Sequence, residues 1–119
     1  MQIGYYFTIP PAKQTVYENL LPDYFRKQLN GKKMVEQLDD IFKKNSIDYY
    51  VNTVNLLKDW HKLRPADKVF YQFDVHWSEW GAFIAYQKLI NTIRIKYPWI
   101  GKPLESTDVK MDTIYYNEA

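Results

Sequence analysis

The chain has 119 residues, of which 46% are hydrophobic, 18% aromatic and 25% charged, and its net charge at pH 7 is +2. This length and balance predict one packed globular domain and exclude an intrinsically disordered chain. The lack of cysteine excludes disulfides, thiolate chemistry and a cysteine-based zinc site. The basic residues are scattered along the chain, which argues against nucleic-acid binding. No stretch approaches the roughly 18 consecutive apolar residues of a membrane span.

Extended and helical patterns alternate in the first half of the chain. Residues 2–9 are rich in aromatic and β-branched types and end at two prolines, which predicts a buried strand. A loop or short helical turn over 12–17 and a short helix over 23–29 follow. Residues 30–45 carry apolar side chains at helical spacing, which predicts an amphipathic helix with a solvated charged face. Its apolar stripe contains Met34, Val35, Leu38, Ile41 and Phe42.

The second half continues the alternation. Residues 47–51 predict a second strand and 54–63 a helix, which has Leu56, Trp60 and Leu63 on one side. After a turn at Pro65, residues 68–73 predict a third strand. Ser78 is a good N-cap for a helix over 79–96, which Pro98 ends. The side chains expected on the buried face of that helix are Ala82, Tyr86, Leu89, Ile90, Ile93 and Tyr97. A late strand is predicted near 111–116.

Strands that alternate with helices predict an α/β domain with a mainly parallel sheet and right-handed crossovers. The third strand runs into a short loop that carries a carboxylate and a histidine, Asp74-Val75-His76-Trp77, before the last long helix. In α/β proteins the carboxyl ends of the strands open into the site crevice. Any chemistry is therefore expected at this loop.

The Asp-x-His spacing has a chemical rationale. Residues two apart at a strand end can place their side chains on the same side, so that Asp74 accepts the Nδ1–H of His76 and fixes its tautomer. Nε2 is then left to deprotonate a hydroxyl. A purely structural pair has the same spacing, so the spacing alone leaves both interpretations open.

The loop and its surroundings resemble a known family. The run Phe73-Asp74-Val75-His76-Trp77-Ser78-Glu79-Trp80-Gly81-Ala82 is similar to the D-x-H-W-(T/S/N)-x-x-G-A segment of the alginate O-acetyltransferases, the SGNH-hydrolase-like proteins of AlgX and AlgJ type that modify bacterial exopolysaccharides. Upstream, the Ile-Pro-Pro-Ala-Lys run over 9–13, Val16-Tyr17 and Leu20-Leu21-Pro22 resemble the strand, loop and YP-x-x-L region of that group. The similarity extends loosely over residues 3–97.

The resemblance implies a three-layer, flavodoxin-like SGNH domain over residues 1–119 that needs no cofactor. It also implies an acyl-transfer triad with Asp74 as orienter and His76 as general base. In the family the nucleophilic serine follows in a Gly-Asp-Ser block, which this sequence lacks. None of Ser46, Ser78 and Ser106 has the context of a nucleophile elbow. We therefore expect a truncated domain, inactive by itself, whose serine lies outside this chain.

The resemblance further implies a polysaccharide acceptor, an acyl donor and other exopolysaccharide-modification proteins as partners. It implies a periplasmic or extracytoplasmic location for the parent protein, although the first residues show neither the charged nor the apolar region of a signal peptide. If the parent is exported, Met1 is not expected to be its native start.

Other residues have alternative interpretations. His61, next to Trp60, is expected to be solvent-facing or satisfied rather than a ligand, and a metal site at Asp74 and His76 lacks further ligands. The tryptophans and tyrosines are expected mainly in the core, but Trp77 and Trp80 adjoin the histidine and could stack on a sugar ring. A non-catalytic glycan-binding or assembly module on the same scaffold is the alternative function, and a cytoplasmic interaction domain is a third.

Overall fold

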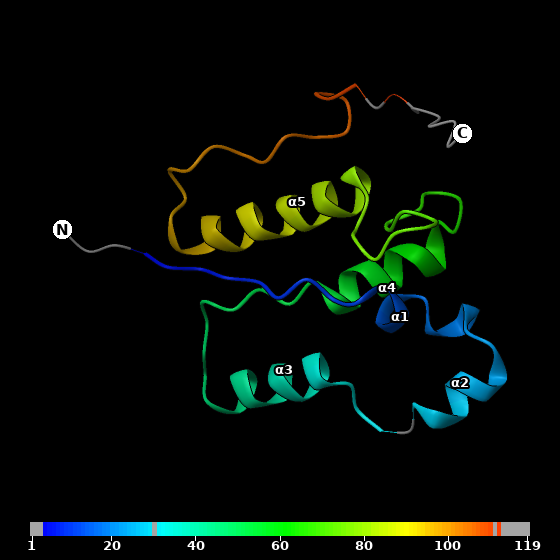
Figure 1. The fold of residues 1–119 in the computed structure, drawn as a ribbon. Helices are drawn as coiled ribbons and strands as arrows, with labels where there is room; N and C mark the ends of the chain where they lie inside the picture. Colours follow the sequence, from blue (N-terminus) through cyan, green and yellow to red (C-terminus); the bar gives the residue numbers. More distant parts are fainter. Residues whose placement is uncertain (1–3, 30, 111, 113–119) are drawn as a thin grey trace.

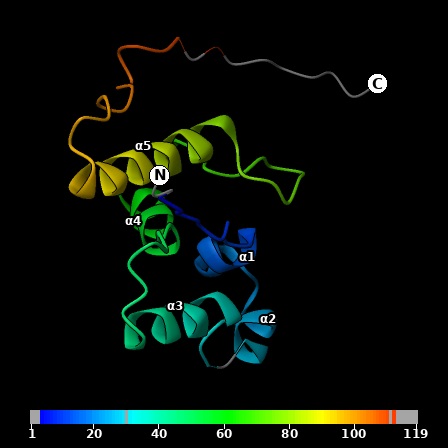
Figure 2. The same ribbon diagram turned by 90° about the vertical axis from the view of Figure 1, so that its left-hand side faces the viewer.

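The computed structural model describes residues 4–29, 31–110 and 112, and this part of the chain consists of helices joined by extended segments (Figure 1). The helical elements are α1 (Lys13–Val16), the 3₁₀ turn η1 (Glu18–Leu20), α2 (Asp23–Gln28), α3 (Met34–Lys44), α4 (Val54–Leu63) and α5 (Glu79–Lys96). Figures 1 and 2 show α5 on one side of α4, and α3 with α2 on the other. α1 packs against α4 within the middle layer.

The predicted helices over 54–63 and 79–96 are confirmed with their bounds, and those over 23–29 and 30–45 are confirmed in slightly shorter form. α4 begins after Asn52, whose side-chain oxygen accepts the Val54 N–H at 2.8 Å. α3 begins where the Glu36 carboxylate accepts the N–H of Lys33 at 2.9 Å, which satisfies one of the free donors of a helix start.

The predicted α/β class, a three-layer, flavodoxin-like domain with a mainly parallel sheet, is wrong. The described residues contain no strand, only two isolated bridges. Phe7 and Tyr50 form one parallel bridge, in which Phe7 N–H donates to Tyr49 O at 2.9 Å and Val51 N–H donates to Phe7 O at 2.8 Å. The expected first and second strands therefore lie side by side at one point only. The late strand predicted near 111–116 lies outside the described residues, apart from residue 112.

The expected third strand fails for a specific reason. The backbone N–H groups of Val69 and Phe70 donate to the phenolic oxygen of Tyr17, at 3.0 and 3.2 Å. Phe70 instead forms an antiparallel bridge with Trp77 of the same loop. Because a side chain accepts the hydrogen bonds that a neighbouring strand would need, this segment remains irregular, with bends at Val69, Gln72 and Phe73.

The core is small and lies where α1, α4, α5 and the segment before the loop meet. Its buried cluster consists of Val16, Tyr17, Leu57, Val69, Phe70 and Ile84. The predicted faces of two helices need correction. In α4 the expected Leu56 and Trp60 do pack, half-buried, against the core cluster, but Leu63 is 81% exposed. The buried residues of this helix are Val54, Leu57 and His61. In α5 they are Gly81, Ile84 and Ala85, and the six expected residues are only half-buried.

α3 contacts the rest of the chain through charged groups and through Phe42, whose ring centroid lies 5.6 Å from that of Phe7 and 4.6 Å from that of Tyr50. Its predicted apolar stripe is only partly covered, because Met34 is 78% exposed and Ile41 51%. Glu36 accepts a hydrogen bond from Lys58 of α4 at 2.7 Å, and the pKa of Glu36 is lowered by this bond and by the Lys33 backbone N–H. Across the described part of the chain, no helix combines the length and apolar character needed to cross a bilayer.

Candidate functional site

The Asp-x-His loop is a short irregular hairpin that projects beside the first turn of α5 (Figure 2). Its base is closed by two backbone hydrogen bonds: Ser78 N–H donates to Val69 O at 2.9 Å and Tyr71 N–H donates to His76 O at 3.3 Å. The tip is open to solvent, since Phe73 is 90% exposed and Val75 72%. Apolar packing therefore does not determine the shape of the tip.

The structure brings Asp74 and His76 into direct contact. Asp74 Oδ1 lies 2.7 Å from Nδ1 of the imidazole and also accepts the backbone N–H of His76 at 3.2 Å. These bonds lower the pKa of the Asp74 carboxyl, the backbone N–H more than the imidazole, so the carboxylate form is favoured. Within the described residues Nε2 has no hydrogen-bond partner, and the side chain is 76% exposed. The imidazole can therefore exchange a proton at Nε2 with a group approaching from outside.

Ser78 has the structural role that was predicted for it. Its Oγ accepts the N–H of Gly81 at 3.1 Å and so caps α5, and it donates to Lys68 O at 2.7 Å. This buried hydroxyl therefore both donates a hydrogen bond to the backbone and accepts one from it. The structure brings neither Ser46 nor Ser106 into a hydrogen bond with His76 among the described residues.

The structure explains why a glycine is required at position 81, five residues after His76. A Cβ at this position would lie 2.3 Å from the carbonyl oxygen of Val69 and 3.2 Å from Cβ of Trp77. The first turn of α5 therefore approaches the base of the loop more closely than any side chain allows. The motif contains Gly81, but a local pattern does not show which distant atoms this residue contacts.

Lys13 is a residue of the loop's surroundings that sequence reasoning missed. From α1, its Nζ donates to three backbone carbonyls of the loop, those of Tyr71 at 2.5 Å, Gln72 at 2.7 Å and Asp74 at 3.0 Å. It belongs to the Ile-Pro-Pro-Ala-Lys run, which was noted only as part of a similar segment. Local patterns carry no signal for a contact between residues about 60 positions apart.

The two tryptophans beside the histidine are half-buried and pack against the core cluster. Trp80 stacks on Phe83 with ring centroids 5.7 Å apart and meets Trp60 edge-on at 5.6 Å. Its indole N–H is buried without a hydrogen-bond partner in the described chain. The prediction that Trp77 and Trp80 bind a sugar remains a prediction, and both rings have a packing role.

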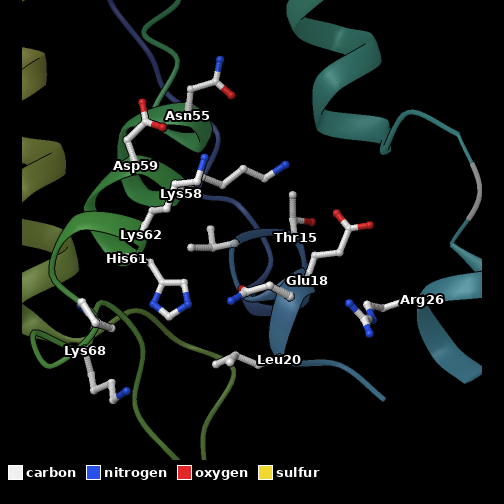
Figure 3. A pocket seen from close by; sticks show the side chains of 13 residues that line it. Thr15, Glu18, Leu20, Arg26, Asn55, Lys58, Asp59, His61, Lys62 and Lys68 are labelled. Atoms are coloured by element: carbon white, nitrogen blue, oxygen red, sulfur yellow. The ribbon is translucent and has the colours of Figure 1, made fainter. Parts of the chain in front are cut away.

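A separate open pocket of about 740 Å³ lies between α4, α1 and η1 (Figure 3). His61 stands in its wall, buried, with its ring 4.4 Å from that of Tyr17. Burial lowers the pKa of His61, and the positive charge of Lys68 lowers it further. Neither Asp74 nor His76 lines this pocket. In the part of the chain that the structure covers, no three histidine, aspartate or glutamate side chains are grouped as metal ligands would be.

A model of one protein family matches almost the whole chain. Residues 2–113 match the family model described as "SGNH hydrolase-like domain, acetyltransferase AlgX". Searches of curated proteins and of solved structures found no match. The matched region contains the Asp74–His76 loop, Gly81 and Lys13.

Proposed function

The chain belongs to the family of SGNH hydrolase-like domains of the acetyltransferase AlgX, and on this premise we propose that Asp74 and His76 are the orienter and general base of an O-acetyltransferase. The observation that carries the proposal is the 2.7 Å contact between Asp74 Oδ1 and Nδ1 of His76, with Nε2 directed to no other described group. This is the arrangement that the Ser-His-Asp mechanism requires.

In the proposed mechanism, Nε2 of His76 takes the proton of a serine hydroxyl as its oxygen attacks the carbonyl carbon of an acyl donor. The resulting imidazolium is stabilised by the Asp74 carboxylate, and its proton then passes to the departing group of the donor. A sugar hydroxyl next attacks the acyl-serine while His76 takes its proton. The serine recovers its proton, and the sugar carries a new ester.

The serine in this scheme comes from sequence outside these 119 residues. Supporting this part of the proposal, Ser78 has both hydrogen-bonding functions engaged by the backbone, and Ser46 and Ser106 make no described contact with His76. We infer that the acceptor is an exported polysaccharide and that the parent protein works in the periplasm or another extracytoplasmic space. By itself the chain is expected to be inactive, because removing the serine of a triad costs about as much as removing the whole triad.

The same lack of a serine at His76 favours one alternative, a glycan-binding or assembly module that keeps the scaffold without catalysis. The two functions differ in a measurable way. The enzyme needs a serine that reacts with a fluorophosphonate only when His76 is intact, whereas the binding module has no such serine.

The test uses a longer protein that carries this chain together with a Gly-Asp-Ser block, assayed for acetyl-ester turnover and fluorophosphonate labelling. We expect His76→Ala to lower kcat by about 10³-fold or more and Asp74→Asn by about 10³–10⁴-fold, with smaller changes in KM. Ser106→Ala, at an exposed serine, is the matched control and should be neutral. Undiminished turnover in His76→Ala would refute the catalytic assignment.

A further inference from the structure

We propose that Lys13 is a positioning residue for the Asp74–His76 pair: its ammonium group holds the loop over 71–74 in the shape that lets the carboxylate reach the imidazole. The catalytic consequence of this proposal rests on the proposed function, but the positioning itself does not. α1 thereby acts on the candidate site from about 60 residues away in the sequence.

The contact is specific to an ammonium group. A lysine Nζ has three N–H donors, and here three carbonyl oxygens converge on it within 3.0 Å. The acceptors belong to Tyr71, Gln72 and Asp74, so the cation bridges three peptide groups of the loop. Without the cation, these exposed oxygens would take hydrogen bonds from water instead, and no single group would hold the three together, which favours a more open loop.

The other contacts of the loop fix its base but not its tip. Tyr17 and Ser78 fix the base of the loop at Val69 and Phe70. Glu79 of α5 accepts a hydrogen bond from the side chain of Tyr71, which lowers the pKa of Glu79. These contacts do not reach the backbone of residues 72–74. Since Phe73 is exposed, apolar packing does not fix the tip either.

The consequence for His76 follows from the position of the third carbonyl. Lys13 binds the backbone oxygen of Asp74 itself, and the side chain of the same residue binds Nδ1 of the imidazole. A loop that opens at Asp74 moves Oδ1 away from Nδ1. His76 then loses the partner that fixes its tautomer, and a misplacement of about 1 Å can cost roughly 10²-fold in rate.

The first test measures the tautomer of His76 by nitrogen NMR on this chain at alkaline pH. The wild-type protein should show Nδ1–H with an unprotonated Nε2, and Lys13→Met should shift the signal toward the tautomer mixture of a free imidazole. Lys102→Met, at an exposed lysine, is the matched control and should keep the wild-type signal. An unchanged tautomer in Lys13→Met would overturn the proposal.

A rescue experiment separates charge from fold. The chain has no cysteine, so Lys13→Cys can be alkylated at that position alone, in denaturant, and then refolded. Aminoethylation restores an ammonium of nearly the same length and should restore the wild-type tautomer, whereas a propyl thioether should not. Equal signals from the two adducts would refute the positioning role. Loss of the whole fold in every uncharged variant would make Lys13 a general structural anchor and would also refute it.

The kinetic arm uses the longer protein with its serine block. Lys13→Met should lower kcat about 10–100-fold with little change in KM. If His76→Ala leaves turnover unchanged, the proposed function fails, and the tautomer experiment still decides the role of Lys13. If His76→Ala abolishes turnover but Lys13→Met has neither effect, only the positioning proposal fails.

Discussion

Replacing Gly81 by alanine should damage both the stability of the chain and the candidate site. The added Cβ would lie 2.3 Å from the carbonyl oxygen of Val69, more than 1 Å closer than the 3.4 Å at which ordinary contacts begin. That oxygen accepts the N–H of Ser78 at 2.9 Å, and Ser78 in turn caps α5. Because the obstacle is backbone held by the same helix, no side-chain rotation can relieve the clash.

Two opposing contributions determine how much Gly81→Ala changes the free energy of unfolding. Overpacking a close contact costs about 1–3 kcal/mol, and more where the backbone has to move. Alanine is about 1 kcal/mol better than glycine inside a helix, and this preference is weaker in the first turn. The cost of the overlap between the added Cβ and Val69 O therefore exceeds the gain from the higher helix propensity of alanine. We expect the free energy of unfolding to fall by about 1–2 kcal/mol. For a chain of this size, each kcal/mol lowers Tm by about 4 °C.

The assay is urea unfolding followed by circular dichroism, with Tm measured in parallel. Gly101→Ala is the matched control, since a Cβ there meets no atom within 4 Å, and it should stay within about 0.5 kcal/mol of wild type. Relief of the clash at Val69 also tilts the loop, so the His76 tautomer signal should change in Gly81→Ala only. A Gly81→Ala protein as stable as the control would show that the close approach is not a constraint.

Three further predictions concern the core. Tyr17→Phe leaves the two buried N–H groups of residues 69–70 without an acceptor and should lower the free energy of unfolding by about 2–4 kcal/mol in urea titrations; a loss below about 0.5 kcal/mol would contradict this. Leu57→Ala, at a fully buried side chain, should cost about 2–5 kcal/mol, whereas Leu63→Ala, at a side chain 81% exposed, should be neutral. The lowered pKa of His61 means that the unfolded chain binds its proton more readily, so stability should fall as the pH drops below about 6.5. His61→Phe should flatten this dependence, and an equally steep loss in that variant would assign it to other groups.

The helices were predictable from the sequence because their signals are local. Apolar spacing and the Ser78 cap gave the bounds of α5, and the turn at Pro65 placed the end of α4. The buried faces were less predictable, since they depend on which neighbour a helix meets. α4 turns Leu57 inward and leaves Leu63 exposed, although both are leucines in an amphipathic segment.

The sheet was wrongly predicted because pairing is not a local property. Residues 68–73 have the composition of a strand, yet the hydroxyl of Tyr17 takes the N–H groups of Val69 and Phe70. Composition records only a preference for extended backbone. It does not record which acceptor the backbone finds.

Two side chains about one helical turn apart, those of Lys13 and Tyr17, both contact the segment that contains the Asp-x-His loop. Lys13 and Tyr17 are four residues apart, a spacing that places side chains on the same face of a helix; Lys13 is the first residue of α1 and Tyr17 is its C-cap. Tyr17 holds the base of the Asp-x-His loop and Lys13 holds its tip. The two anchors therefore work only if α1 is helical. A proline in place of Thr15 removes the N–H that donates to Ala12 O at 2.9 Å. It should weaken the Asp74–His76 contact without touching either residue, and the His76 tautomer signal measures this change.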